Sequence, residues 1–529
     1  YSSAASDVYK RQVYENTDSE TTFNWTIDGK SICTASTLTF SADEAGRYYI
    51  LISATNAGGT TEKEIRIDVF QLDVPTISIA DADKGFKVLQ GSELTITPVV
   101  DSFLDTSYSW QINGQEVSTE PNYSFPTNEL GEYDVRFSTH NEDGEDEISF
   151  KVEVCSPDQI DFNWTFLQDE YNMSSGRTIQ IKPVDIKNAQ DAIYTWSVNN
   201  KQVQSGASDS YLFTSDQEGE HTIKVEMKNS YILVTQTLKV NVCPPEGTYQ
   251  RKINATSSAS MNKVYEFLPA PGQFVNENYT VTTMAEACTY AEERINQTAY
   301  VSLGGFGGYI IVGFDHSIVN DGDYNIAVTG NAFDGSSEPG IVWVMQDENG
   351  DGLPNDTWYE LRGSEYGKAE TWQDYAVTYH KPTGIQLPTP WTDNHGQSGS
   401  IDYLGAFHRQ DYYYPAWVKE KQYTLRGTRL KERNYDQSGN GTYWVNDSYE
   451  WGYADNFSAI DRLTDDDNYN AGPSDNHFKI SHAVTFDGKD ANLKYIDFIK
   501  VQVGVNSKSG WLGEISTEVF GIKDFNMLK

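Results

Sequence analysis

Apolar and polar residues alternate in short runs along the first 243 residues, and three of these runs carry a tryptophan. The three runs are Phe23–Ile27, Tyr108–Ile112 and Tyr194–Val198. Each leads into two turn residues that tolerate the positive φ of a tight hairpin, namely Asp28-Gly29, Asn113-Gly114 and Asn199-Asn200. A glycine follows 21 to 23 residues after each tryptophan and opens a second alternating run. This pattern predicts two-sheet β-sandwiches with the tryptophans in their cores.

These segments repeat with a period near 85 residues, which indicates an array of equivalent domains. The repeats resemble PKD/Ig-like domains that lack the disulfide between the sheets. We expect a truncated repeat at 13–70 and complete repeats at 71–155 and 156–243. Pro and small polar residues then predict a linker at 244–260. Such an array is typical of a stalk.

The beginning of the chain looks foreign. Residues 1–12 are interpreted as an artefact, because Asp7–Gln12 resembles the translation of a sequencing-adapter end. We therefore expect the natural N-terminus, with any signal peptide or lipid anchor, to be missing from this sequence. Four cysteines, at positions 33, 155, 243 and 288, form no CxxC motif, so unpaired and half-buried thiols are expected.

The pattern changes in residues 261–529. Apolar runs near both ends of this region, such as Gly340–Met345 and Ala491–Val503, predict a larger β-rich, jelly-roll-like domain with long insertions. Apolar residues at helical spacing, together with the capping-box pair Thr283 and Glu286, predict one helix ending at Asn296. The fold class is therefore all-β, an array of PKD/Ig-like sandwiches followed by a C-terminal domain with one helix and long loops.

A glycine-rich run at Leu303–Gly308 raises the question of phosphate binding. The run lacks the Lys-Ser/Thr ending of a phosphate-binding loop, and no helix follows it, so a hairpin is expected.

The segment Asp347–Asp356 has oxygen-bearing residues at its first, third and fifth positions and glycine at its sixth, as a Ca²⁺ loop requires. The twelfth position is Trp358 instead of Glu, so the segment is not an EF-hand and resembles a short thrombospondin-type or dockerin-type loop. The alternative is an acidic turn without metal. The expected ligands of a structural calcium ion are Asp347, Asn349, Asp351, Leu353 and Asp356.

Charge and composition narrow the class of protein. The chain has 77 acidic and 39 basic residues, a formal net charge of −38, which excludes a binder of nucleic-acid backbones or anionic lipid. Aromatic residues make up 13%, too many for a disordered acidic chain, and no apolar run reaches the ~18 residues that span a bilayer. This balance, with few Met and Cys, is typical of an extracytoplasmic surface protein.

The region between Tyr366 and Phe457 is rich in aromatic residues, and loops that long inside a compact domain are usually functional. Tyr and Trp supply rigid contact area with a polar tip, which suits a bulky amphipathic ligand. The alternative is that several of them fill the core of the insertion. The candidate ligand-binding residues are Trp391, Tyr403, Phe407, His408, Tyr412, Tyr413, Tyr414, Trp417, Tyr443, Trp444 and Trp451.

Catalysis is the weaker hypothesis. No GxSxG, HExxH or Cys-His motif occurs, and the region between Tyr366 and Phe457 has only three histidines, His380, His395 and His408. We therefore predict a protein that is not an enzyme.

Several motifs of the C-terminal region resemble those of cell-surface lipoproteins of gut Bacteroidetes, and most of all the cobamide-binding surface lipoproteins (BtuH type). The motifs are Glu266–Phe274, Leu303–Gly308, Gly330–Phe333, Glu338–Val342 and Gly513–Glu518. The resemblance implies an outward-facing outer-membrane lipoprotein that captures a corrinoid and hands it to a TonB-dependent transporter. In that case His395 or His408 could ligate cobalt.

Two other hypotheses remain open. A carbohydrate-binding or adhesin protein would present flat aromatic strips, whereas a corrinoid would need one deep, wide pocket. A polysaccharide-active enzyme would need two carboxylates facing each other across a cleft.

Overall fold

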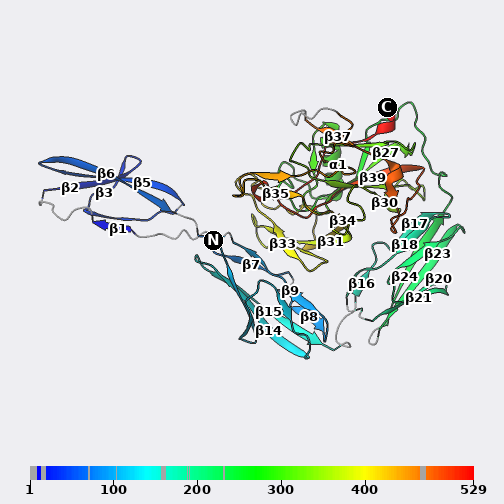
Figure 1. Cartoon of the computed structure of the whole chain (residues 1–529), viewed down its shortest axis with the longest axis horizontal. Coiled ribbons are helices and arrows are strands. Elements are labelled where there is room, and N and C mark those ends of the chain that lie inside the picture. The colour runs from blue at the N-terminus through cyan, green and yellow to red at the C-terminus, as the bar shows by residue number, and fades with distance from the viewer. Residues whose placement is uncertain are drawn as a thin grey trace. The chain divides into compact units, whose positions relative to one another are not determined.

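The computed structural model describes residues 9–12, 20–43, 45–69, 72–80, 82–102, 104–156, 163–187, 189, 191–229, 233–464 and 472–529 (Figure 1). The chain forms two compact units. The first comprises Tyr1–Ser78, Val100–Pro121 and Asp134–Phe150, and the second comprises Ile79–Val99, Asn122–Tyr133 and Lys151–Lys529. The regular secondary structure of the described residues is almost entirely strand, with a single α-helix, which confirms the predicted all-β class. Among them, no helix has the length and apolar character that crossing a bilayer requires.

The first sandwich contains β1 to β6. Its strands are β1 (Tyr9–Gln12), β2 (Thr22–Ile27), β3 (Lys30–Cys33), β4 (Thr37–Phe40), β5 (Gly46–Asn56) and β6 (Gly59–Val69). One sheet has the order β3-β2-β5-β6, and β1 pairs with β4. The residues expected to be foreign therefore include one strand, while residues 1–8 lie outside the described part. A cavity of about 280 Å³, lined in part by Trp25, Phe40 and Ile65, opens on the core of this sandwich.

The next nine strands belong to the second repeat. They are β7 (Thr76–Ser78), β8 (Phe86–Leu89), β9 (Leu94–Ile96), β10 (Val99–Asp101), β11 (Ser107–Ile112), β12 (Gln115–Ser118), β13 (Tyr123–Phe125), β14 (Gly131–His140) and β15 (Glu145–Cys155). The main sheet has the order β12-β11-β14-β15-β8, and β8 runs parallel to β15. Trp110 is fully buried, with its ring 4.4 Å from that of Phe137.

The third sandwich repeats this arrangement. Its strands are β16 (Asn163–Thr165), β17 (Glu170–Ser174), β18 (Thr178–Ile181), β19 (Val184–Lys187), β20 (Ile193–Val198), β21 (Lys201–Gly206), β22 (Tyr211–Thr214), β23 (Gly219–Lys228) and β24 (Leu233–Cys243). The main sheet has the order β17-β24-β23-β20-β21, and β17 runs parallel to β24. Trp196 lies in the core, as does Trp25 in the first sandwich, so the predicted role of the three tryptophans is confirmed.

The C-terminal domain is built on a six-stranded sheet that joins early and late strands. Its order is β25-β27-β39-β29-β30-β38, from β25 (Lys263–Leu268), β27 (Tyr309–Val319), β39 (Tyr495–Val503), β29 (Gly340–Met345), β30 (Trp358–Leu361) and β38 (Ala483–Val484). The two apolar runs quoted from the sequence thus become neighbouring strands, since β29 and β39 pair in antiparallel register. Long insertions leave and re-enter this sheet, as predicted.

Smaller sheets and short helices complete the domain. A three-stranded sheet has the order β37-β28-β41, from β37 (Ser474–Phe478), β28 (Ile326–Gly330) and β41 (Gly521–Asp524). A four-stranded sheet has the order β33-β32-β31-β34, from β33 (Ser398–Ile401), β32 (Thr389–Asp393), β31 (Trp372–His380) and β34 (Gln422–Arg429). The pairs are β26 (Val301–Ser302) with β40 (Glu518–Val519), and β35 (Asn434–Asp436) with β36 (Trp444–Asn446). Three short helical turns are η2 (Ile480–His482), η3 (Gly510–Leu512) and η4 (Phe525–Met527).

The predicted helix is α1 (Met284–Asn296), which packs against β25. The Thr283 hydroxyl oxygen accepts the N–H of Glu286 at 3.3 Å, and the Glu286 carboxylate accepts the N–H of Thr282 at 2.7 Å. Both ends of the capping interaction therefore satisfy N–H groups that the first turn leaves unpaired.

The segment expected as a linker lies against the C-terminal domain. Glu246 accepts hydrogen bonds from the Gln346 amide at 2.7 Å and the Lys494 N–H at 2.8 Å. The Arg251 guanidinium pairs with the buried Asp497 at 3.0 Å. Glu246 and Arg251 hold the segment 244–260 against the C-terminal domain, although its Pro-rich and Ser-rich composition predicts a linker.

Two further predictions concern single residue types. All four cysteines are free thiols, and those at positions 155, 243 and 288 are buried. In the glycine-rich run, a Cβ on Gly304 would lie 2.1 Å from the Ala270 carbonyl oxygen. The run is therefore a tightly packed turn leading into β27. The predicted hairpin is wrong, because β26 (Val301–Ser302) pairs with β40 (Glu518–Val519), whereas β27 pairs with β25 and β39.

Candidate functional site

The region 366–457 contains β31 to β36, and the structure divides its aromatic residues between core and surface. Tyr413, Tyr414 and Trp417 are buried in the main hydrophobic core of the C-terminal domain. The Tyr414 hydroxyl donates to the Glu420 carbonyl at 2.9 Å, and the Tyr413 hydroxyl donates to the His408 carbonyl at 3.0 Å. These three candidates are structural, as the alternative from the sequence anticipates for part of the set.

Three further candidates are half-buried against the same core. They are Trp391, Tyr403 and Tyr412. A Cβ on Gly399 would lie 2.5 Å from the Trp391 indole, so this ring is pressed against the backbone of β33.

His395 and His408, the two histidines considered as cobalt ligands, are held by neighbours. His408 Nδ1 lies 2.6 Å from a Glu277 carboxylate oxygen, and its ring packs edge-on against Phe274 at 4.9 Å. His395 stacks on Trp372 with the ring centroids 4.2 Å apart. Both imidazoles therefore have structural contacts that a role as a cobalt ligand would have to replace.

Phe407 lies on the surface near Trp511, which is not among the candidate residues predicted from the sequence. The side chain of Phe407 is 64% exposed, that of Trp511 is 49% exposed, and their ring centroids are 6.2 Å apart. Trp511 stands about a hundred positions later, outside the aromatic-rich region, so composition alone gave no signal for it. Leu512 beside it is also exposed.

Trp444 joins this surface through Gly510. A Cβ on Gly510 would lie 2.3 Å from the indole nitrogen of Trp444, so the indole rests directly on the backbone next to Trp511. We call Phe407, Trp444, Trp511 and Leu512 the aromatic surface. Tyr443 precedes Trp444 and is 60% exposed.

Hydrogen bonds hold the turn that carries Trp511. The Ser509 hydroxyl donates to the Asn446 side-chain oxygen at 2.6 Å, and the Asn434 amide donates to the Lys508 carbonyl at 2.7 Å. Lys508 also pairs with Asp402 at 2.7 Å, which links the turn to the loop of Phe407. The aromatic surface is therefore supported from two sides and has charged groups at its edge.

Motifs that carried the family resemblance form framework contacts. The N–H of Gly305 donates to the Pro271 carbonyl at 3.1 Å, and the N–H of Gln273 donates to the Glu514 carboxylate at 2.7 Å. These runs hold distant segments together in the interior. These contacts contribute to the fold of the domain.

The expected calcium loop follows β29. The N–H groups of Gly350 and Gly352 donate to the two carboxylate oxygens of Asp347, at 2.8 and 3.0 Å. One oxygen of Asp356 accepts the N–H of Glu348 at 2.8 Å, and the other is buried without a hydrogen bond. Burial, opposed by that hydrogen bond, raises the pKa of Asp356 to about 8.

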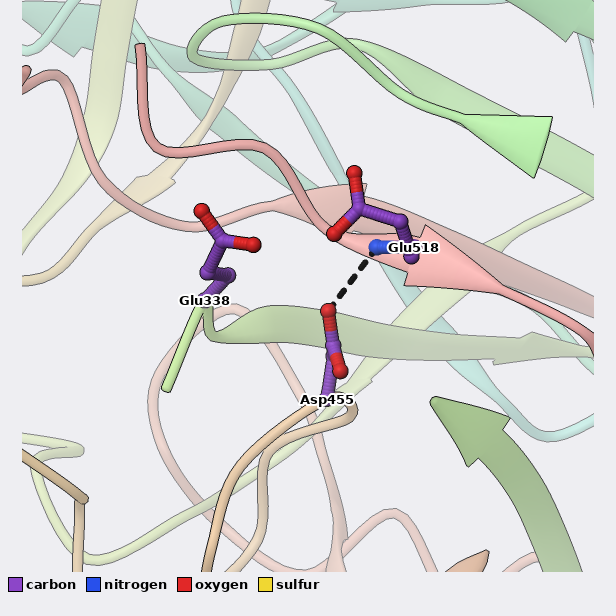
Figure 2. Close-up of side chains that lie close together, drawn as sticks. All are labelled: Glu338, Asp455 and Glu518. Atoms are coloured by element: carbon purple, nitrogen blue, oxygen red, sulfur yellow. Dashed lines mark hydrogen bonds between the residues drawn. The ribbon is translucent and has the colours of Figure 1, made fainter. Parts of the chain in front are cut away.

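A different acidic group converges in the interior. Figure 2 shows the carboxylates of Glu338, Asp455 and Glu518 directed toward one another, with the Glu518 N–H donating to Asp455 at 2.9 Å. Their oxygen atoms lie within 4.8 Å of one another, and within the described ranges this is the one such set of three. Shared protons or one cation could bridge them. The acids of the loop after β29 do not converge in this way.

Burial governs the charge of this acidic group. Burial, followed by the neighbouring Glu338 carboxylate, raises the pKa of Asp455 to about 8. Burial also raises the pKa of Glu518 well above its usual range and that of the half-buried Glu338 above its usual value. The group therefore retains protons near neutral pH. It joins the start of β29, the turn at Asp455 and β40.

Comparison with known proteins agrees with this architecture. Residues 10–56, 74–141 and 159–229 match the PKD-like domain family. The chain therefore carries PKD-like domain repeats ahead of a large β-rich C-terminal domain. No curated protein matches the chain.

Three solved structures illustrate the similarity. The Clostridium thermocellum CbhA fibronectin(III)-like modules share 15% identity over 32% of this chain and 95% of theirs, with a TM-score of 0.18. The titin I-band fragment I67-I69 shares 12% identity over 46% of this chain and 93% of its own, with a TM-score of 0.20. The third structure is the Bacteroides ovatus mixed-linkage glucan utilization locus protein SGBP-B in complex with a mixed-linkage heptasaccharide. It shares 12% identity over 93% of this chain and 92% of its own, with a TM-score of 0.19.

Proposed function

We propose that this protein is a non-catalytic binding protein of the cell surface that captures a glycan on the aromatic surface of its C-terminal domain, with the PKD-like repeats as a stalk. The observation that carries the proposal is the pair of exposed rings of Phe407 and Trp511, fixed 6.2 Å apart and continued by Trp444. The apolar face of a sugar ring packs on such rings while polar groups at the edge bind hydroxyls.

The same surface supports a glycan better than a corrinoid. A corrinoid would need one deep, wide pocket, and three of its predicted contacts, Tyr413, Tyr414 and Trp417, are core residues. The corrinoid, with its handover to a TonB-dependent transporter, is kept as the competing outcome of the experiment below.

The absence of catalysis is part of the proposal. Retaining and inverting glycosidases need two carboxylates about 5–10 Å apart across an open cleft. In Glu338, Asp455 and Glu518 the acids are packed together in the interior, with Asp455 accepting the N–H groups of Asn331 and Ala332. This arrangement supports a structural role for the group.

The experiment is a glycan array with the full chain, followed by calorimetric titration of each hit and of cyanocobalamin. We expect saturable glycan binding that Trp511→Ala and Phe407→Ala each weaken about tenfold, because each removes ring contact worth about 1.4 kcal/mol. Phe486→Ala, which removes another exposed ring of the same domain, is the matched control and should leave affinity unchanged. Binding of cyanocobalamin without any glycan would replace the glycan proposal with the corrinoid one.

We also propose a structural calcium ion in the loop Asp347–Asp356, with Asp347, Asn349, Asp351, the Leu353 carbonyl and Asp356 as ligands. Its support is the buried Asp356 oxygen without a hydrogen bond, which a cation would satisfy. The test is the unfolding temperature with excess Ca²⁺ and with chelator, for the natural chain and for Asp351→Asn. We expect Ca²⁺ to raise the unfolding temperature of the natural chain, and to raise that of Asp351→Asn by less. Equal unfolding temperatures with Ca²⁺ and with chelator would refute the calcium site.

A further inference from the structure

A cavity of about 270 Å³ lies in the C-terminal domain, where β30, β37 and η2 meet the loop that begins at Trp451. Pockets for small ligands usually measure about 300–1,000 Å³, so this one is of a size for a single ring. It shares no residue with the aromatic surface. Its lining includes Tyr324, Arg362, Trp451, His477, Lys479 and His482.

The charged groups of this cavity are mainly cationic, against the acidic balance of the chain. Arg362 pairs with Asp490 at 2.5 Å, and Lys479 lies 3.9 Å from an Asp323 oxygen and over the ring of Tyr324. Both cations thus have partners that leave donor capacity, since a guanidinium has five N–H groups and an ammonium has three.

The one acid in the lining, Asp461, is already satisfied by the protein. One of its carboxylate oxygens accepts the N–H of Gly452 at 2.6 Å, and the other accepts the side-chain amide of Asn476 at 2.9 Å. A carboxylate bound in this way does not need the cavity cations. The space therefore favours an anionic group of a ligand.

Two imidazoles add directional hydrogen bonding. His477 Nδ1 lies 2.7 Å from the Asp461 carbonyl oxygen, an acceptor, so Nδ1 is the donor and Nε2 is left for a ligand. His482 lies beside Trp451, with ring centroids 5.1 Å apart. Burial, followed by Arg362 and Lys479, lowers the pKa of His482, so this ring is neutral at pH 7 and can both donate and accept.

We propose that this cavity is a second binding site that takes one sugar ring bearing a carboxylate, of the hexuronate class. The ring packs on Trp451, the carboxylate lies between Lys479 and Arg362, and hydroxyl groups bond to His477 Nε2 and His482. Aromatic lining alone would accept a neutral sugar, and cations alone would accept any small anion. The combination in one ring-sized space selects a ligand with both features. The proposal does not depend on the aromatic surface binding a glycan.

The test is ligand-observed NMR and calorimetric titration of the full chain with three probes: glucuronate, glucose as the neutral ring, and inorganic phosphate as the ringless anion. We expect saturable binding of glucuronate, with glucose and phosphate each at least tenfold weaker. Raising the salt concentration should weaken glucuronate binding, because charge contributes to it.

Variants locate the site. Lys479→Gln should weaken glucuronate binding about tenfold, whereas Lys489→Gln, an exposed lysine of the same domain, should not. Trp451→Phe keeps a ring and should bind, and Trp511→Ala should leave glucuronate binding unchanged, which separates this site from the aromatic surface. An unaltered unfolding temperature shows that each variant is folded.

Four results would overturn the proposal, and three of them concern glucuronate. They are the lack of saturable glucuronate binding, equal affinity for glucuronate and glucose, and an unaffected Lys479→Gln variant. If phosphate binds as tightly as glucuronate, the cavity is a site for simple anions, and the proposed sugar ligand is refuted.

Discussion

Gly510 determines how Trp444 lies on the aromatic surface. Its φ of +53° is unfavourable for other residues, and the Trp444 indole occupies the space that a Cβ would need. We expect Gly510→Ala to displace the indole and weaken binding at the aromatic surface about tenfold, as measured by titration with the best array glycan. Gly439→Ala, at a φ of +69° with open space around it, is the control for backbone strain alone. Equal affinities of the two variants would contradict the role of Trp444.

The acidic group makes stability depend on pH in a defined direction. Because the folded pKa values of Asp455 and Glu518 are raised, the folded state binds protons that the unfolded chain releases above about pH 4. Stability should therefore fall as the pH rises from about 4 to about 8. We expect Glu518→Gln to reduce this loss, because a glutamine has no carboxyl group to ionise as the pH rises.

Denaturant unfolding of the C-terminal transition at pH 5 and pH 8 measures this effect. Glu420→Gln, at an exposed acid of the same domain, should leave the pH dependence unchanged. If Glu518→Gln loses as much stability between pH 5 and pH 8 as the natural chain does, the protonation of the acidic group is contradicted.

Residue type alone separated core from surface only in part. Trp25, Trp110 and Trp196 were predicted as core residues because each stands in an alternating strand, where side-chain direction follows from position. Tyr413, Tyr414 and Trp417 stand in a loop without such a period, so composition could not distinguish a buried ring from a contact surface. Pairing across about a hundred residues, as in Phe407 with Trp511, is information that only the fold supplies.

The N-terminus of α1 offers a test of one helix. Removing the hydroxyl of Thr283 leaves the N–H of Glu286 without its partner, so Thr283→Ala should cost about 1 kcal/mol. That loss corresponds to a decrease of about 2–4 °C in the unfolding temperature of the C-terminal domain. Thr289→Ala makes the same change at an exposed position inside the helix and should be neutral or slightly stabilising. Scanning calorimetry compares the two, and equal shifts would contradict the cap.

Elements with strong local signals were predictable, and those fixed by distant contacts were not. The hairpins after the tryptophan strands follow from their turn residues, since Asp28, Asn113 and Asn199 have positive φ as expected. The docking of residues 244–260 depends on Arg251 reaching the buried Asp497, a partner 246 positions away. The convergence of Glu338, Asp455 and Glu518 depends in the same way on three separate segments.

The whole chain should not unfold in one step, because the sandwiches and the C-terminal domain have separate cores. Among described residues, the core of the first sandwich has four buried side chains and that of the third has fifteen, and a cavity opens on the former. We expect the first sandwich to melt at the lowest temperature. Scanning calorimetry, with limited proteolysis at the first transition, checks this order. Early cleavage within 163–243 instead of 22–69 would contradict it.

The parallel strand pairs have a mechanical consequence for the PKD-like repeats. In the second repeat β8 lies beside β15, and in the third β17 lies beside β24, so an early strand runs parallel to the final one. Tension applied at the two ends of such a repeat slides these strands lengthwise past each other. The ladder hydrogen bonds then bear the load together instead of opening one after another. Extension of such an array is therefore resisted by shear within each repeat.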